Sequence, residues 1–269
     1  MKKSFLILLL SVMIIFTLAG EKGKISIEGS TTVLPIAQIA AEEYMMANPA
    51  VDITVRGGGS GVGIASLMEG SCDIADASRS MKDNEIKNAI NKGINPVAHV
   101  VAMDGIAVAV HPSNKMTGLT VEQIKAIFTG RISNWSKVGG LDKKIVVISR
   151  DSASGTYEAF GNLALNGDRV RADALLSASN RAVITTIETT PGAIGYVGLG
   201  YLTKKVKAIE VDGVECTKEN VLSGEYPLSR PLFMYTNGKP AGQVKAFIDF
   251  VKSAEGQALV EDVGYVGLK

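Results

Sequence analysis

Apolar and polar positions follow two alternating patterns along the chain. Amphipathic segments predict helices over 34–48, 63–70, 82–93, 120–130, 155–165, 182–190 and 241–264. Shorter β-rich runs predict strands over 24–29, 51–57, 72–78, 95–112, 144–150, 192–199 and 227–237. Strands that alternate with helices are typical of α/β domains, so we expect an α/β fold with mainly parallel strand pairing.

Two extended runs are suited to pass between separate parts of the molecule. One surrounds residues 100–110 and the other residues 231–235. Two lobes joined by two such strands would leave a cleft between them. No internal repeat, low-complexity stretch or long polar linker interrupts the pattern, and the length of 269 residues suits one large or two medium domains.

The first twenty residues differ in kind from the rest. Two lysines precede an apolar run over 5–18, and small residues follow it. This order is typical of a secretory signal, whereas a membrane-spanning helix needs about 20 apolar residues. We therefore expect a cleaved export signal over 1–20 and a location in the periplasm or on the outer face of the cytoplasmic membrane. The alternative is an uncleaved anchor; Glu21 stands where a lipoprotein has its cysteine.

Composition narrows the classes of partner and cofactor. Lysine and arginine number 28 against 27 aspartates and glutamates, for a net charge of +1, so nothing indicates a nucleic-acid partner. Cys72 and Cys216 are the only cysteines, which leaves a disulfide open without establishing one. They share no ligand spacing with His99 and His111, so we expect no metal and no cofactor. His111 ends an apolar strand, which favours a surface position.

Three loops that lead from a strand into a helix share one composition. They cover 28–32, 57–61 and 149–160, and each brings small hydroxyl residues to a helix N-terminus. Such an end has unpaired N–H groups and a partial positive charge, which suits an anion. The plainer alternative for each loop is an N-cap beside a turn. The hydroxyl residues are Ser30, Thr31, Thr32, Ser60, Ser152, Ser154 and Thr156.

An arginine adds weight to the anion hypothesis. Arg150 ends a predicted strand just before the third loop, and the planar fork of arginine matches tetrahedral oxyanions through paired hydrogen bonds. A fourth loop adds Ser78 and Arg79 at another strand end. Because ligands of open α/β sheets bind beyond the carboxyl ends of strands, we expect the four loops to meet around one anion.

Known catalytic and nucleotide motifs fit poorly. The glycines over 57–63 do not follow G-x-G-x-x-G, and the chain contains no G-x-x-x-x-G-K-[ST]. No G-x-S-x-G surrounds Ser60 or Ser154, and no base histidine is placed beside a serine. We therefore expect no catalytic residue and no enzyme: the donors are suited to hold an anion. A secreted phosphatase or other hydrolase with Ser60 or Ser154 as nucleophile is the alternative.

At this point the sequence resembles the phosphate-binding proteins of bacterial phosphate ABC transporters. The resemblance runs in order through "IEGSTTVLPIA", "GGGSGVGI", "CDIADASR", "DGIAVAVHP", "IKAIFTGRISNW", "SRDSASGTYEAF", "PGAIGYVG" and "SAEGQALVEDVGYVGL". It implies a two-lobed, type II periplasmic-binding-protein fold, in which two mixed-sheet lobes are joined by two crossing strands and close over one dehydrated phosphate. We expect one lobe to contain 24–104 plus 230–269, and the other 105–229.

The resemblance also implies which residues contact phosphate. Well-known members carry an aspartate where this chain has Ser78, and that carboxylate accepts the proton of hydrogen phosphate, which sulfate lacks. Other members share the serine–arginine pair, which implies that Ser78 contacts the ligand. Asp76 and Asp151 stay open as the discriminating acceptor, and Asp151 as a group that orients Arg150. The implied contacts are Thr31, Thr32 through its backbone, Ser60, Gly61, Ser78, Arg150, Ser154, Gly155 and Thr156.

The expected function is that of an exported, monomeric receptor that captures inorganic phosphate and delivers it to an ABC transporter permease. A hinge motion between the lobes would close the site around the ligand. A receptor for another tetrahedral oxyanion, such as sulfate or molybdate, on the same fold is the alternative, since specificity depends on hydrogen bonds that the sequence does not display.

Overall fold

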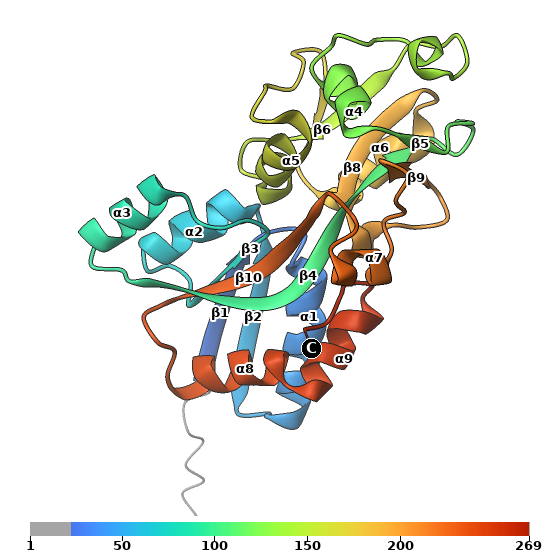
Figure 1. Cartoon of the computed structure of the whole chain (residues 1–269). Coiled ribbons are helices and arrows are strands. Elements are labelled where there is room, and N and C mark those ends of the chain that lie inside the picture. The colour runs from blue at the N-terminus through green and yellow to red at the C-terminus, as the bar shows by residue number, and fades with distance from the viewer. Residues whose placement is uncertain (1–22, 269) are drawn as a thin grey trace, which may run out of the picture.

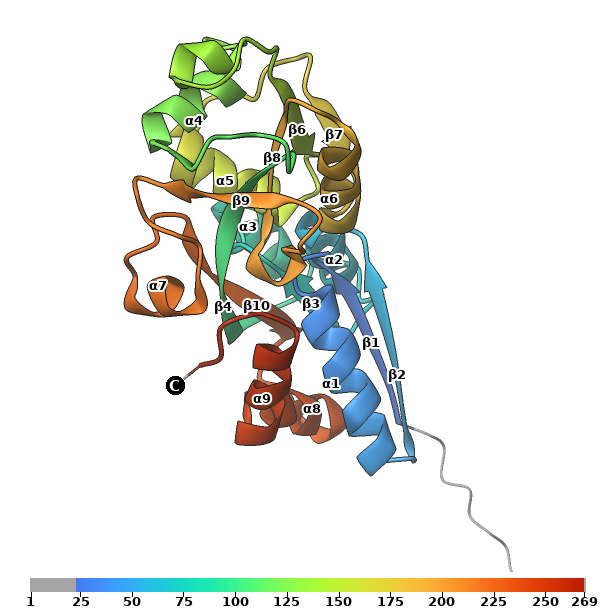
Figure 2. The ribbon, with the colours of Figure 1, turned by 90° about the vertical axis from the view of Figure 1, so that its right-hand side faces the viewer.

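Residues 23–268 are the part of the chain that the computed structural model describes, and the predicted export signal over 1–20 lies outside it. The described chain forms two lobes, one below and one above in Figure 1. Turned by a quarter, the molecule is elongated along the line that joins the lobes (Figure 2).

The first lobe is built on a mixed sheet. Its strands are β1 (Gly23–Gly29), β2 (Val51–Gly57), β3 (Ile74–Ala77), β10 (Ser229–Asn237) and the first part of β4 (Pro96–Val110). They lie in the order β2-β1-β3-β10-β4. β1 pairs in parallel with β2 and β3, whereas β10 runs antiparallel to β3 and β4.

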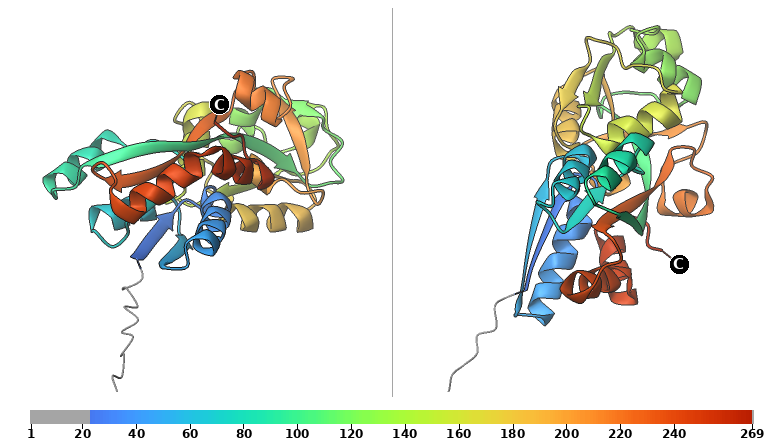
Figure 3. Two further views of the ribbon diagram at one scale, coloured as in Figure 1. Left: turned by 90° about the horizontal axis from the view of Figure 1, so that it is seen from below. Right: turned by 90° about the vertical axis from the view of Figure 1, so that its left-hand side faces the viewer.

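Helices cover both faces of this sheet (Figure 3). α1 (Leu34–Ala47), α8 (Gly242–Lys252) and α9 (Ala254–Asp262) pack on one face, while α2 (Ser60–Met68) and α3 (Asp83–Asn91) pack on the other. Because successive strand residues point to opposite faces, Ile74 joins the core under α1, and Ala75 and Ala77 join the core under α2. Pro35 fits the first turn of α1, where its missing N–H costs nothing.

The second lobe contains the other strands and helices. β8 (Ala193–Gly198) pairs with β6 (Val146–Arg150), which pairs with β7 (Leu175–Ser177), and β9 (Lys207–Val211) joins β4 to β5 (Gly118–Leu119). α4 (Val121–Phe128) and α5 (Gly155–Leu165) share one hydrophobic core, and α6 (Asn180–Thr189) packs in a second. α7 (Lys218–Ser223) and the 3-10 turns Trp135–Val138 and Leu199–Tyr201 complete the lobe.

Two crossing strands join the lobes, as the sequence predicts. β4 pairs with β10 over 96–105 in the first lobe and with β8 over 106–110 in the second. β4 and β10 therefore pass between the lobes side by side, near Asp104 and Arg230. The two-lobed α/β architecture is confirmed, whereas the lobe bounds 24–104 plus 230–269 and 105–229 stay a prediction.

Some local predictions differ from the structure. Strand pairing is mixed rather than mainly parallel, because β4 and β10 run antiparallel to their neighbours. The helix predicted over 241–264 is two helices, since Ser253 has extended backbone (ψ 167°) and its side chain caps α9. β5, β7, β9 and α7 were not predicted. β5 and β7 are only two and three residues long, which is too short to give a clear periodic pattern.

The remaining sequence questions concern thiols, metals and membranes. Cys72 and Cys216 are both free thiols, so the disulfide that the sequence leaves open is not formed. Over residues 23–268, no group of three or more His, Cys, Asp and Glu side chains is arranged to hold a metal ion. Within the same range, no helix is long and apolar enough to cross a membrane.

Candidate anion-binding site

The loops singled out in the sequence converge where the two lobes meet. Residues 30–32 follow β1, α2 begins after β2, and residues 78–79 follow β3, all in the first lobe. Arg150 ends β6 and α5 begins shortly after it, in the second lobe. Seven of the predicted side chains are no more than 7 % exposed: Thr31, Thr32, Ser60, Ser78, Arg150, Ser154 and Thr156. Ser152, which the sequence places with these hydroxyl residues, is exposed. Small polar residues buried together in this way need partners.

Two tyrosines fix the first loop. The hydroxyl of Tyr201 donates to the carbonyl of Thr31 at 2.6 Å, and the hydroxyl of Tyr265 donates to the carbonyl of Thr32 at 2.7 Å. Burial raises the pKa of both phenols, so they stay protonated donors. The N–H of Thr32, which the resemblance directs to the ligand, donates instead to Ser30 Oγ at 3.1 Å. The carbonyl of Thr31 and the two threonine hydroxyls are then the groups of this loop that contact the other lobe.

Hydrogen bonds across the cleft hold the two lobes together. Thr32 Oγ1 lies 2.8 Å from Thr156 Oγ1, and Asn180 Nδ2 donates to the hydroxyls of Thr31 and Thr32 at 3.2 and 3.0 Å. The N–H of Gly61, predicted to contact a ligand oxygen, donates to the carbonyl of Ala153 at 2.9 Å. The structure is therefore a closed arrangement, in which the main chain at Gly61 contacts the opposite lobe.

The hydroxyl groups of Thr31, Thr32, Ser60, Ser78 and Thr156 form what we call the cage. Glycine is required at two points around it. Gly59 has φ +102°, a backbone conformation that side chains disfavour, and a Cβ there would lie 2.7 Å from the carbonyl oxygen of Ala153. A Cβ on Gly155 would lie 2.2 Å from Ser60 Oγ and 2.8 Å from Ser78 Oγ. Ser60, Ser78 and Gly155 thus surround one small space at the start of α5.

Arg150 is the clearest sign of an anionic ligand. Its Nε and Nη2 donate to the carbonyls of Ser177 and Ala178 at 2.9 and 3.0 Å. Its Nη1 is buried and has no hydrogen-bond partner in the described chain. Burial lowers the pKa of this guanidinium, and nearby Asp151 opposes that effect. A buried cation with an unpaired N–H group is costly unless an anion accepts from it.

The N-terminus of α5 adds further donors. Ser154 is the N-cap, and its Oγ accepts from the N–H of Tyr157 at 3.2 Å. Helix geometry provides no intrahelical acceptor for the N–H groups of Gly155 and Thr156. The start of α5, with the positive end of its helix dipole, therefore lies beside Ser60 and Ser78, which suits a negative charge.

The two aspartates left open by the sequence differ in position. Asp151 accepts from the N–H of Ala153 at 2.9 Å, so it shapes the loop, and it forms no ion pair with Arg150. Asp76 is 1 % exposed, and its Oδ1 has no hydrogen-bond partner. Burial raises the pKa of Asp76 well above its usual range. Burial therefore disfavours the ionised form of the Asp76 carboxyl.

Arg79 serves the contact between the lobes. Its guanidinium donates to both carboxylate oxygens of Glu85 at 2.7 Å, and its Nε lies 2.9 Å from Glu158 at the start of α5. Lys82 also pairs with Glu158 at 2.9 Å. Arg79 and Lys82 belong to the first lobe and Glu158 to the second, so these ion pairs join the rims of the cleft.

Sequence reasoning missed three residues at the centre of this arrangement. Arg230 is 5 % exposed and forms an ion pair with fully buried Asp104. Asn180 accepts from the N–H of Gly198 and donates to the first loop. Burial raises the pKa of Asp104, and Arg230 lowers it. An arginine within the apolar strand 227–237 was the available signal, since a charge in a buried strand needs a partner.

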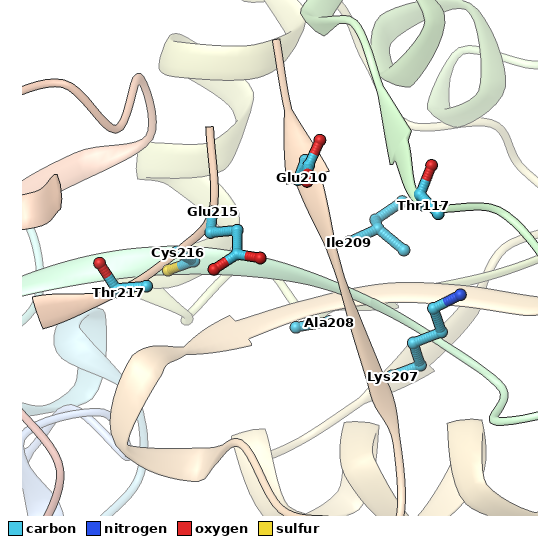
Figure 4. Close-up of a pocket in the computed structure, with 8 residues that line it drawn as sticks. All are labelled: Thr117, Lys207, Ala208, Ile209, Glu210, Glu215, Cys216 and Thr217. Carbon is cyan, nitrogen blue, oxygen red and sulfur yellow. The ribbon is translucent and has the colours of Figure 1, made fainter. Parts of the chain in front are cut away.

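One surface hollow, of about 330 Å³, borders the site: Arg150, Asp151 and Ser152 are among the residues that line it. A pocket of about 380 Å³ in the second lobe is lined by Thr117, Lys207, Ala208, Ile209, Glu210, Glu215, Cys216 and Thr217 (Figure 4). None of the predicted ligand contacts lines it. The candidate site is therefore the buried contact between the lobes, where the charged and hydroxyl groups gather.

Comparison with known proteins first establishes the class. Residues 17–255 match the family model described as a PBP superfamily domain. The chain is 35 % identical to a Clostridium perfringens phosphate ABC transporter substrate-binding protein that was solved with bound phosphate, with a TM-score of 0.86 over 92 % of this chain and 100 % of that one. An ABC-type phosphate transport receptor from Vibrio cholerae is also 35 % identical, with a TM-score of 0.76 over 91 % of this chain and 100 % of that one.

Sequence relatives then establish the family. The phosphate-binding protein PstS of Bacillus subtilis is 39 % identical over 246 residues, which cover 91 % of this chain and 80 % of the relative. The phosphate-binding protein PstS of Borreliella burgdorferi is 35 % identical over 282 residues, covering 100 % and 99 %. The chain belongs to the PstS family of phosphate-binding proteins within the PBP superfamily.

Proposed function

We propose that the protein is an exported receptor that binds inorganic phosphate between its lobes and delivers it to an ABC transporter permease. The observation that carries the proposal is the unpartnered Nη1 of buried Arg150, at the strand end just before the N-terminus of α5. Relatives of 35–39 % identity that are named as phosphate-binding proteins support the same ligand. We propose a monomer that works in the periplasm or on the outer face of the cytoplasmic membrane.

The proposed ligand contacts divide into charged, hydroxyl and backbone groups. Arg150 supplies the charge, and the start of α5 supplies N–H groups and its dipole. The hydroxyls come from both lobes, so an anion between them stabilises the closed state over the open one. The proposed contacts are Thr31, Thr32, Ser60, Gly61, Ser78, Arg150, Ser154, Gly155 and Thr156. Because the N–H groups of Thr32 and Gly61 are bonded within the protein, Thr32 is proposed to contribute its hydroxyl, and Gly61 lies next to Ser60. The lobes are proposed to cover 24–104 plus 230–269, and 105–229.

We propose capture without chemical change of the ligand. The serine hydroxyls that a hydrolase would use have no histidine beside them in the described chain, because His99 bonds Thr236 and His111 bonds Ser113. Ser60 Oγ accepts from the N–H of Ser78 at 3.0 Å. These contacts support a binding protein over a phosphatase.

Isothermal titration calorimetry with phosphate and with sulfate at neutral pH tests the proposal. We expect binding of one phosphate per molecule and much weaker binding of sulfate. Absence of phosphate binding by calorimetry and by thermal shift would refute the proposed function. Equal affinity for sulfate would keep the anion site and refute its selectivity, which would show that Ser78 does not replace the aspartate of other members.

A further inference from the structure

Arg230 occupies a position that no predicted contact shares. It lies on β10 where that strand leaves the second lobe, paired with Asp104 on the neighbouring strand β4. Its Nε and Nη2 donate to Asp104 Oδ2 at 3.0 and 2.8 Å. The same guanidinium reaches both lobes: Nη1 donates to the carbonyl of Ser78 at 2.9 Å, and Nη2 donates to Thr156 Oγ1 at 3.0 Å.

The two buried arginines of the site differ in how fully their N–H groups are hydrogen-bonded within the protein. Arg230 donates to acceptors of the protein from all three of its nitrogens. Arg150 has one buried nitrogen with no partner. The two arginines therefore differ in role: Arg150 is available to bind the anion, and Arg230 positions the groups around it.

Hydrogen-bond direction extends this difference to the hydroxyls. Guanidinium and amide nitrogens only donate, so the oxygen that faces them must accept. Thr156 Oγ1 accepts from Arg230, and Thr32 Oγ1 accepts from Asn180. The O–H groups of both threonines are therefore free to donate. Since the two oxygens lie 2.8 Å apart and one bond between them uses one proton, the other proton is left for an acceptor outside this pair.

We propose that Arg230 is a positioning residue that couples anion capture to lobe closure. Asp104 anchors its guanidinium at the crossing strands, and from there it orders the Ser78 loop of the first lobe and the Thr156 hydroxyl of the second. Opening at the hinge separates Arg230 from Thr156, so this contact belongs to the closed state. The inference rests on the proposed function, because it assigns a role at the same site.

The Arg230→Lys variant tests the inference. Lysine keeps the charge beside Asp104 but has no planar fork, so it cannot hold the Ser78 carbonyl and the Thr156 hydroxyl together. We expect stopped-flow kinetics to show phosphate dissociation at least about tenfold faster, the factor for losing a hydrogen bond to a charged group. The association rate and the stoichiometry of one phosphate should not change, because the affected contacts form after encounter.

Controls separate this role from a general loss of structure. Arg171→Lys makes the same change in an arginine whose charged partner, Asp173, is exposed, and dissociation should stay at the wild-type rate. If Arg230→Lys does not fold, Arg230→Gln combined with Asp104→Asn removes both buried charges, and the same kinetics are measured. A lower stoichiometry with wild-type rates in the remaining molecules would overturn the inference, as would unchanged dissociation. A wild-type protein that does not bind phosphate would instead refute the proposed function.

Discussion

Replacing Arg150 with methionine removes the one charged group of the site that has an unpaired N–H. Methionine retains much of the side-chain volume, and the change removes a guanidinium that burial already penalises. Removing one partner of a buried, hydrogen-bonded charge pair costs about 2–5 kcal/mol. With about 3 kcal/mol lost, the phosphate Kd rises about 100-fold, since 1.4 kcal/mol is about tenfold.

The unliganded protein should respond differently from the complex. Without phosphate, Arg150→Met trades two carbonyl contacts for relief of a desolvated charge, so we expect little change in thermal stability. At a phosphate concentration of 100 times the wild-type Kd, the wild type gains about 2.7 kcal/mol. A variant with 100-fold weaker binding gains about 0.4 kcal/mol under the same condition.

Thermal unfolding with and without phosphate, together with calorimetric titration, measures both effects. Arg171→Met is the matched control, because Arg171 also has a buried nitrogen without a partner but forms its ion pair with exposed Asp173. An affinity of Arg150→Met within about threefold of the wild type would refute the reasoning. An equal loss in Arg171→Met would do the same, since it would show that an unpaired arginine nitrogen does not mark the ligand.

Three further changes probe packing, ionisation and closure. Gly155→Ala places a methyl group against the serine hydroxyls. The overpacking costs about 1–3 kcal/mol, so calorimetry should show about five- to 150-fold weaker phosphate binding. Its control, Gly161→Ala, lies in open space on the same helix and should stabilise the fold by about 0.5–1 kcal/mol in urea unfolding. Burial raises the pKa of Asp76 in the folded state, so the native protein binds more protons than the unfolded chain above about pH 4. The free energy of unfolding therefore falls as pH rises towards the folded pKa. Asp76→Asn should remove this fall in urea titrations. Glu158→Gln breaks two ion pairs across the cleft, which should weaken phosphate binding about two- to fivefold at low salt and less at high salt. Asp249→Asn, which breaks an exposed ion pair on α8, should leave phosphate binding unchanged.

Each of these expectations has a contrary result. Wild-type affinity in Gly155→Ala would mean that the start of α5 does not line the ligand space. A parallel pH profile for the wild type and Asp76→Asn would show that the Asp76 carboxyl is ionised in the folded protein. A loss of affinity in Glu158→Gln that persists at high salt would indicate a direct role of Glu158 at the ligand instead of an ion pair between the lobes.

Local signals in the sequence located much of the structure. The helix over 155–165 and the strand end at Arg150 are each decided by a few neighbouring residues, and both are confirmed. The helix predicted over 63–70 begins earlier, at Ser60. The crossing strands were found for a similar reason, because long apolar extended runs are visible without any partner.

Groups that meet only in three dimensions were not predictable in this way. Arg230 and Asp104 are 126 positions apart, and their pairing depends on the antiparallel register of β4 and β10. The N–H groups of Thr32 and Gly61 were predicted to face a ligand, but Ser30 and Ala153 take them. A backbone donor's partner is decided by how the loops dock, which composition does not encode.

The contact between Gly61 and Ala153 separates two properties that most binding sites combine. It is a bond between two main chains, so no side chain supplies its donor or its acceptor. Side chains in the cage can therefore change, and the ligand preference can change with them, while this hydrogen bond between the closed lobes is retained. Such an arrangement lets natural selection change which ligand is bound without changing the main-chain contact that closes the lobes.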